Sequence, residues 1–167
     1  MVGRDEVMKK ELVEMINDIR QKLEEDPSSI IYAQIKGRCE SEMRENFCTN
    51  EYYDFLKESN GARFGIIDFC NYERMEGIQF RVTDLPGAEK EWLCIGQILY
   101  EPLVMNRKSK LLYLYFQGHE DDKEPIYLGQ FDDFLANYVF GAKYAEIVPN
   151  CDEDDWYTFL KENKYIE

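Results

Sequence analysis

Apolar positions near the start of the chain recur at the three- and four-residue intervals of an amphipathic helix. The helix is predicted over residues 5–25, and the pair Asp26-Pro27 ends it. Its apolar face consists of Met8, Leu12, Met15, Ile16, Ile19 and Leu23. A heptad zipper would use the same face, but three methionine-rich turns favour packing onto the rest of the domain. We therefore expect residues 1–26 to form a helix that packs on its own domain.

The segment 27–48 has no clear period and could contain a short strand or a helix. A second helix is predicted over 50–59, with Thr49 or Asn50 as its N-cap, because either side-chain oxygen can accept an unpaired backbone N–H. Gly61 is expected in the left-handed conformation at C′ of this helix, directly before a strand. A phosphate-binding glycine loop needs the opposite order, because the helix N-terminus must face the anion. This stretch is therefore interpreted as a helix stop.

From residue 62 onward the apolar pattern has the short runs and the alternation of β-strands. The predicted strands lie in ARFGIIDF, GIQFRVTDL, EWLCIG, EPLVMNR, LLYLYF and PIYLG. EPLVMNR and LLYLYF are expected to form a hairpin across a charged turn. Alternation places Tyr113 and Tyr115 on the same side of their strand, where packing under a helix is favoured over a sugar- or base-stacking surface.

Helical spacing returns at Phe131, where FDDFLANYVFG predicts a helix with Gly141 at C′. A shorter last helix is predicted over 153–162. The strands occur in one run between helices and do not alternate with them, which favours an α+β fold over a doubly wound parallel sheet. We expect a single domain over residues 1–167, with a mixed or mostly antiparallel sheet flanked by helices.

The chain is acidic, with 34 acids, 20 bases and a formal charge of −14. This charge disfavours direct binding to nucleic acids and anionic membranes, whose phosphates would be repelled, but it permits a basic protein partner. Residues 117–167 carry 13 acids and 4 bases, hence −9, and the preceding 116 residues carry 21 acids and 16 bases, hence −5.

Two acidic runs in the C-terminal third are candidates for a partner-binding surface. They are Glu120, Asp121 and Asp122, and Asp152, Glu153, Asp154 and Asp155. The second run precedes a predicted helix, where acids supply an N-cap and complement the helix dipole. Four carboxylates exceed what capping requires, so the remainder could attract a basic partner.

Few residues offer catalytic or metal-binding chemistry. The five cysteines, at 39, 48, 70, 94 and 151, include no CxxC pair, so we expect neither a zinc site nor a disulfide framework. His119 is the single histidine, and the run that it begins lacks the spacing of a calcium loop. No GxSxG motif surrounds a serine. We expect neither an enzyme nor a bound cofactor.

We expect no signal peptide and no membrane-spanning segment. Charges recur every few residues in MVGRDEVMKKELVEM, so no apolar signal-peptide core is present, and no apolar run is long enough to span a bilayer. A reducing cytoplasm is the compartment that we expect.

The helix-to-turn stretch YYDFLKESNG resembles the signature of the SUKH superfamily. That signature is an aromatic residue, Phe-Leu, three variable residues and Asn-Gly, represented here by Tyr53 (or Tyr52), Phe55, Leu56, Asn60 and Gly61. Two weaker matches follow in the family's order, WLCIG with Trp92 and Gly96, and FDDFLANYV with Phe131, Phe134 and Leu135. Many members have a glycine-rich turn after Ile-Gly, whereas this chain continues to Glu101-Pro102, which leaves the subfamily open.

The resemblance implies an α+β fold, structural roles for the motif residues and a binding function without catalysis. Bacterial members of the superfamily are commonly immunity proteins that neutralise a toxin, often a nuclease, and fungal members regulate cell-wall synthesis. We therefore expect a cytoplasmic immunity protein, a monomer or weak dimer, that binds a basic cognate toxin through acidic residues. The alternatives are a regulatory or scaffold module that binds a cellular partner, and an enzyme whose carboxylates converge in a pocket.

Overall fold

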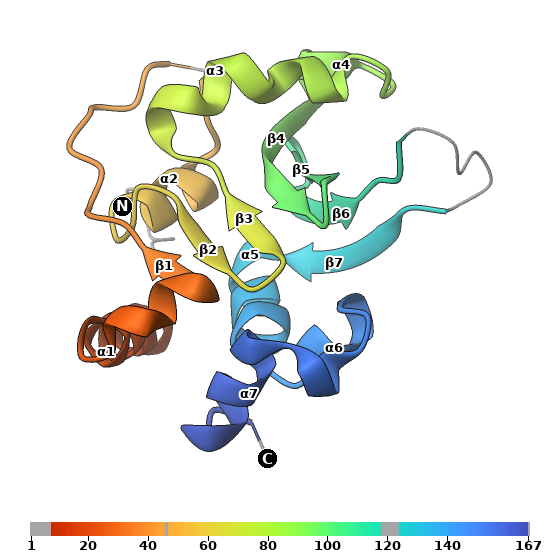
Figure 1. The fold of residues 1–167 in the computed structure, drawn as a ribbon. Helices are drawn as coiled ribbons and strands as arrows, with labels where there is room; N and C mark the ends of the chain where they lie inside the picture. Colours follow the sequence, from red (N-terminus) through yellow and green to blue (C-terminus); the bar gives the residue numbers. More distant parts are fainter. Residues whose placement is uncertain (1–7, 46, 118–123, 167) are drawn as a thin grey trace.

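The fold is organised around an antiparallel sheet of seven strands, which follow one another across the sheet in sequence order (Figure 1). The computed structural model describes residues 8–45, 47–117 and 124–166. The strands are β1 Ala33–Ile35, β2 Ala62–Phe64, β3 Ile67–Phe69, β4 Trp92–Ile98, β5 Glu101–Asn106, β6 Leu111–Leu114 and β7 Ile126–Gln130. An α+β fold with an antiparallel sheet is therefore confirmed, and the doubly wound alternative is excluded.

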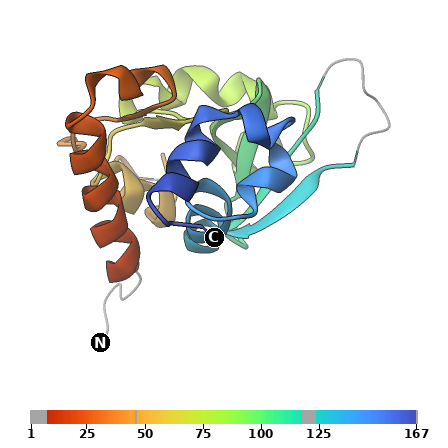
Figure 2. The same cartoon turned by 60° about the horizontal axis from the view of Figure 1, so that its bottom comes forward.

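Helices lie on both sides of the sheet. Helix α1 (Lys10–Glu24) and the C-terminal helices lie together at one side of the molecule, and α3 (Met75–Ile78) and α4 (Ala88–Glu91) lie at the opposite side (Figures 1 and 2). The remaining helical segments are η1 Pro27–Ile31, α2 Asn50–Leu56, η2 Tyr72–Arg74, η3 Gln79–Val82, α5 Phe131–Phe134, η4 Leu135–Val139, α6 Tyr144–Ile147, η5 Cys151–Glu153 and α7 Asp155–Glu162. Among the described residues, no helix has the length and apolar character needed to cross a bilayer.

Helix α1 spans Lys10–Glu24 and buries its predicted apolar face in the main core. It begins later than predicted, because Met8 and Lys9 are not helical, although Met8 is buried. It ends at Glu24, one residue before the predicted end, with Glu25 as its C-cap. Asp26-Pro27 follows, and the carboxylate of Asp26 accepts the backbone N–H of Ser28 to cap η1. The packing prediction is correct, since this face contacts its own domain.

Of the two predicted candidates, Thr49 is the N-cap of α2, and its hydroxyl oxygen accepts the backbone N–H of Tyr52. The helix ends at Leu56, short of the predicted residue 59. Gly61 has the predicted left-handed conformation, with φ of 91°. However, Glu58 is the residue that follows the C-cap Lys57, so Gly61 forms the turn into β2 and is not the C′ residue.

The core is rich in aromatic side chains. Tyr52 and Phe55 of α2 contact Phe131 of α5 and Phe69 of β3, with ring centroids 5.0–6.4 Å apart. The five apolar motif residues of the two helices are fully buried here: Phe55, Leu56, Phe131, Phe134 and Leu135. Their packing accounts for their presence in the sequence.

The helix predicted from Phe131 to Gly141 differs in its second half. One α-helical turn continues as a π-helix, Leu135–Val139, and Gly141 does not have the left-handed conformation expected of C′. A Cβ atom on Gly141 would lie 2.5 Å from the carbonyl oxygen of Ala136. Glycine is required by this close approach of the backbone to itself.

The strand predicted in GIQFRVTDL is wrong, because these residues continue α3 into η3. Ile78 and Val82 are four residues apart and pack on the same cluster, whereas Phe80 is 68% exposed. The buried Gln79 side chain joins this segment to β4: its Nε2 donates to the carbonyl of Cys94, and its Oε1 accepts the N–H of Cys94, both at 2.9 Å. Alternation alone did not distinguish a strand from a helix with i, i+4 apolar contacts.

The hairpin of β5 and β6 is confirmed, with Val104 opposite Tyr113. Tyr113 and Tyr115 lie on one side of β6 and its extension, and their rings contact Trp92 at centroid distances of 5.7 and 5.6 Å. They pack against the cluster that includes Val82 of η3. Packing under a helical segment is therefore the correct interpretation of this aromatic face.

Candidate functional site

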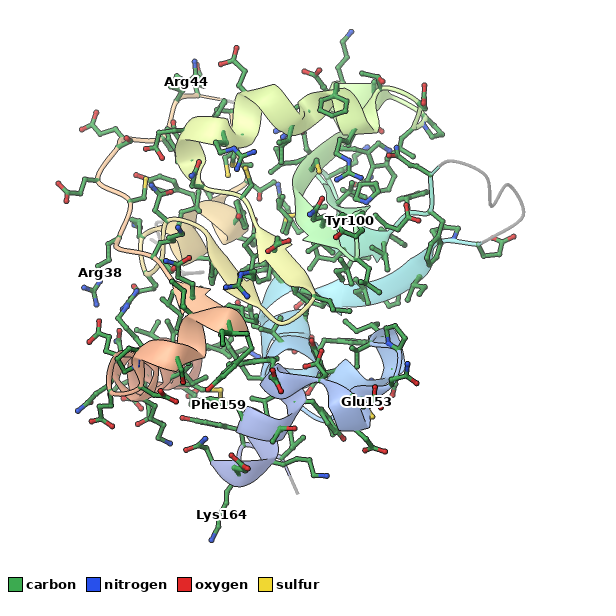
Figure 3. All side chains as sticks on the ribbon, in the orientation of Figure 1. Arg38, Arg44, Tyr100, Glu153, Phe159 and Lys164 are labelled. Atoms are coloured by element: carbon green, nitrogen blue, oxygen red, sulfur yellow. The ribbon has the colours of Figure 1, made fainter. Side chains whose placement is uncertain are left out.

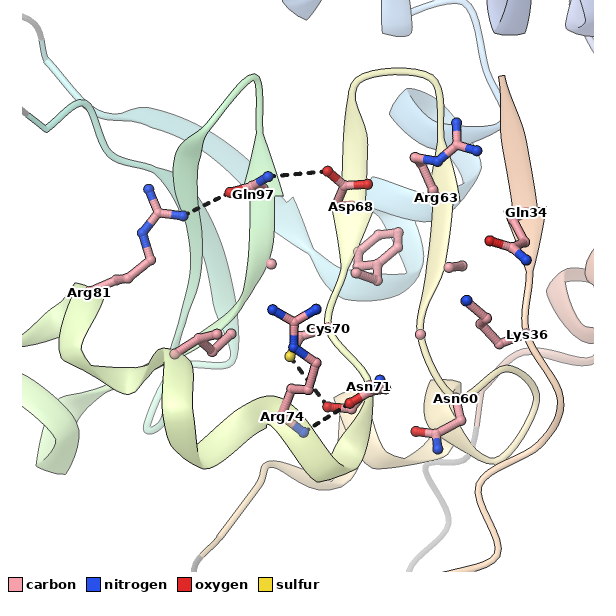
Figure 4. Close-up of a pocket in the computed structure, with 15 residues that line it drawn as sticks. Gln34, Lys36, Asn60, Arg63, Asp68, Cys70, Asn71, Arg74, Arg81 and Gln97 are labelled. Carbon is pink, nitrogen blue, oxygen red and sulfur yellow. Dashed lines mark hydrogen bonds between the residues drawn. The ribbon is translucent and has the colours of Figure 1, made fainter. Parts of the chain in front are cut away.

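A cleft of about 420 Å³ lies on the face of β1–β4 that η2, α3 and η3 border (Figure 4). Most of the residues that line it are polar: Gln34, Lys36, Asn60, Arg63, Asp68, Asn71, Arg74, Arg81 and Gln97. A volume of this size is typical of small-molecule sites. This cleft is the candidate functional site.

The strand register explains why polar side chains gather here. Gln34 is paired with Arg63, Arg63 with Asp68, and Asp68 with Gln97, so one row of four positions crosses four strands. Paired positions in a sheet present their side chains on the same face. The neighbouring positions in these strands point into the core, so the alternation leaves this row on the outer face.

Two of the residues that line the cleft are glycines at which backbone segments approach each other closely. A Cβ atom on Gly96 would lie 2.0 Å from the carbonyl oxygen of Asp68, and one on Gly61 would lie 3.1 Å from the backbone nitrogen of Asn71. Asn60 also lines the cleft; its Oδ1 accepts the N–H of Tyr72 at 2.8 Å. Three residues predicted to be structural parts of the motif therefore also shape the cleft.

The cleft is basic although the chain is acidic. Lys36, Arg63, Arg74 and Arg81 line it together with a single described carboxylate, Asp68, so the lining has four positive charges and one negative charge, hence +3. The whole chain has a formal charge of −14. The cleft therefore provides a local field of the sign opposite to that of the molecule.

Two of the four cations are held by the fold. Nη1 of Arg81 donates to Gln97 at 3.0 Å, Gln97 donates to Asp68 at 3.2 Å, and Nη2 of Arg81 donates to the carbonyl of Tyr100 (Figure 4). Arg63 donates to the carbonyls of Ile30 and Ile31 in η1. These two arginines fasten η3 and η1 to the rim of the cleft.

The other two cations have no such partner. The guanidinium of Arg74 and the amino group of Lys36 form no hydrogen bond or ion pair with any residue that the structure describes, and both side chains are exposed. Arg74 lies over Cys70 in the middle of the cleft, and Lys36 lies at the edge formed by β1 (Figure 4). Their donors are available to a ligand.

The cleft offers charge and hydrogen bonds more than reactive groups. Burial raises the pKa of the Cys70 thiol to about 12, so this thiol is protonated at neutral pH and is a poor nucleophile. Asp68 has no second carboxylate beside it among the described lining residues, and an acid–base pair needs two groups. The arrangement suits binding.

The predicted acidic residues divide into three groups. Glu120, Asp121 and Asp122 lie outside the described residues. Asp154 is used inside the fold, because its Oδ1 accepts the N–H of Tyr157 at 2.9 Å and its Oδ2 accepts the hydroxyl of Tyr144 at 3.0 Å. Asp152, Glu153 and Asp155 are exposed.

We call Asp152, Glu153 and Asp155 the acidic triplet. Glu153 lies beside the C-terminal helices, far from Arg44 at the other end of the molecule (Figure 3). Burial raises the pKa of Tyr32, and the negative charges of Asp26, Asp155 and Glu162 raise it further.

The sequence did not identify the cleft, because its residues come from four strands, three helical segments and the turns beside them, which are spread over the chain. One sequence pattern pointed to it: Gln34, Arg63 and Asp68 are each a polar residue between apolar neighbours in a short strand.

No protein-family model, curated protein or solved structure matches this chain.

Proposed function

We propose that the protein is a non-catalytic, cytoplasmic immunity protein that binds and neutralises a basic cognate toxin, with a nuclease as the expected class. The observation that carries the proposal is the acidic triplet. One carboxylate, that of Asp154, caps α7, and Asp152, Glu153 and Asp155 remain exposed without a hydrogen bond or ion pair to a described residue. The SUKH-like motif supports the same function.

Charge explains how such a surface would act. A nuclease must present positive charge to the phosphates of its substrate. Clustered acids on an inhibitor attract that surface, accelerate the encounter and cover the site where the nucleic acid would bind. The unpaired acids repel one another in the free protein, so a basic partner would relieve this repulsion on binding.

The test is co-expression with the toxin encoded beside this chain, followed by binding kinetics. We expect protection of the cell, a stable complex and an association rate that falls as salt is added. Replacing the acidic triplet by Asp152→Asn, Glu153→Gln and Asp155→Asn should slow association about tenfold at low salt. Absence of both protection and a complex would contradict the proposal.

A matched control tests whether slower association comes from the loss of the acidic triplet or from the change in the total charge of the protein. Glu40→Gln, Glu42→Gln and Glu45→Gln remove the same number of charges from exposed residues in the segment before α2. This control should leave association within about twofold of the unmodified protein. Equal effects of the two triple variants would remove the acidic triplet from the proposal.

The rival function is a regulatory or scaffold module that binds a cellular partner. The basic cleft favours it, because an inhibitor that acts through acidic residues has no need of a cationic site. The identity of the neighbouring gene product discriminates between the two: a toxin-like reading frame immediately upstream supports the immunity function, and its absence supports the rival.

A further inference from the structure

The basic cleft contains more hydrogen-bond donors than the fold uses. Besides Arg74 and Lys36, the side-chain amide of Gln34 and the Nδ2 group of Asn71 form no hydrogen bond with the described residues, although Oδ1 of Asn71 accepts the N–H of Arg74 at 2.8 Å. Asp68 is the only described lining carboxylate, and Gln97 already donates to it. The cleft thus has an excess of donors and of positive charge, which an acceptor-rich anion would satisfy.

We propose that the basic cleft binds the phosphate group of a small phosphorylated molecule, with Arg74 and Lys36 as its direct ligands. A phosphate group has several acceptor oxygens and a charge near −2, so it can be bound by a guanidinium fork, an ammonium group and neutral amides together. All three kinds of donor line the cleft, with Arg74 in its middle and Lys36 at its β1 edge (Figure 4). This site is distinct from the acidic triplet and does not depend on the immunity function.

Arg63 and Arg81 have a supporting role in this site. Their guanidinium groups are committed to backbone carbonyls of η1 and of the β4–β5 turn, so they contribute positive potential without needing to contact the ligand. Replacing either of them would also release a rim segment. The substitutions that test the site are therefore made at Arg74 and Lys36, whose side chains hold no other element in place.

Size and charge together favour a small ligand over a nucleic acid. The cleft volume of about 420 Å³ accommodates a small molecule. Salt screens charges beyond roughly 8 Å at physiological ionic strength, so a small anion in the cleft experiences mainly the nearby charges. These are the four lining cations, the carboxylate of Asp68 and that of Glu73, which accepts from Nδ2 of Asn60 at 2.9 Å. A long polyanion would extend over the rest of a chain with a charge of −14 and would be repelled there.

The test is calorimetric titration of the whole protein with pyrophosphate and inorganic phosphate, in parallel with citrate and a short single-stranded oligonucleotide. We expect saturable pyrophosphate binding, and weaker binding by about tenfold or more in the double variant Arg74→Gln, Lys36→Gln. The control, Lys90→Gln with Lys108→Gln, removes the same charge at two exposed lysines outside the cleft and should change the affinity less than twofold.

Each other outcome overturns the proposal. Absence of saturable pyrophosphate binding at millimolar concentration, or equal weakening in the two double variants, would mean that the cleft is not a phosphate site. Tighter binding of citrate would indicate a carboxylate ligand, and tighter binding of the oligonucleotide would indicate a nucleic-acid site. The variant of the acidic triplet should still bind pyrophosphate, so failure of the cleft proposal and failure of the immunity proposal can be distinguished.

Discussion

Neighbouring carboxylates at the start of α7 differ in their hydrogen bonds. Asp154 accepts hydrogen bonds from the N–H of Tyr157 and the hydroxyl of Tyr144, whereas Asp152 is exposed and has no such partner among the described residues. A helix needs only one N-cap side chain, so residue type alone does not reveal which acid of a run caps the helix. The structure separates the residue that stabilises the fold from those left for a partner.

We predict that Asp154→Ala lowers the free energy of unfolding by about 1–2 kcal/mol, because α7 loses its cap and the Tyr144 hydroxyl loses its acceptor. Asp152→Ala should change it by less than about 0.5 kcal/mol, as expected for an exposed residue. Urea denaturation of both variants measures the difference. Similar losses in the two variants would contradict the assigned cap.

Gly65 is a second residue whose role depends on distant parts of the chain. It has φ of 60°, and a Cβ atom on it would lie 2.0 Å from the Tyr144 hydroxyl oxygen. We predict that Gly65→Ala destabilises the protein by about 2 kcal/mol or more, because backbone strain and displacement of Tyr144 add together. Gly77→Ala, where no atom lies within 4 Å of the new Cβ, should be neutral or stabilising in the same denaturation experiment.

At the scale of elements, the predictions that succeeded rest on local chemistry. The cap of α2 at Thr49 and the β5–β6 hairpin were predicted because a few adjacent residues determine them. The strand predicted in GIQFRVTDL is wrong, because the pattern of apolar residues fits a strand as well as it fits a helical segment with Ile78 and Val82 on one face. The polar side chain of Gln79 is buried with partners in its own helix, the carbonyl of Met75, and in β4, the carbonyl and N–H of Cys94. The residues next to Gln79 do not indicate the pairing with β4.

The cleft could not be predicted for the same physical reason. Register brings Gln34, Arg63, Asp68 and Gln97 into one row, and register is a property of pairing between distant strands. The glycines of the SUKH-like motif were identified from the sequence, yet their position in the lining of the cleft was not. A motif can indicate a fold without indicating which surface the fold creates.

The helical assignment of α3 and η3 has a direct test. Val82 is fully buried and Phe80 is 68% exposed, whereas a strand would place both on the same face. We predict that Val82→Ala lowers the free energy of unfolding by about 2 kcal/mol and that Phe80→Ser changes it by less than about 0.5 kcal/mol. Large losses in both variants would favour the strand.

At the scale of the whole molecule, the two ends of the described chain are joined. The hydroxyl of Tyr165 donates to the carboxylate of Asp18 in α1 and accepts from Nζ of Lys22 at 3.1 Å. Lys22 also forms an ion pair with Asp18 at 3.2 Å. These contacts link the N-terminal helix to the segment after α7, so both ends of the chain contribute to one fold.

The contacts of Asp18 with Tyr165 and Lys22 predict how the stability of the fold depends on pH. The hydrogen bond from Tyr165, and then that from Lys22, lowers the pKa of Asp18, so the folded state favours the charged carboxylate. The stabilisation is therefore present above the ordinary aspartate pKa of about 4, and it is lost as the pH falls through the lower pKa of the folded state. Its size is small, because the Asp18 side chain is 53% exposed and screened by solvent.

We predict that Tyr165→Phe raises the pKa of Asp18 toward its ordinary value, because the strongest of its hydrogen bonds is removed. Tyr157→Phe is the matched control, since the Tyr157 hydroxyl forms no hydrogen bond with the described residues. NMR titration of the Asp18 carboxyl group measures the pKa. The difference in unfolding free energy between the unmodified protein and Tyr165→Phe should shrink below about pH 4. An Asp18 pKa that is the same in both variants would contradict the hydrogen bond between Tyr165 and Asp18.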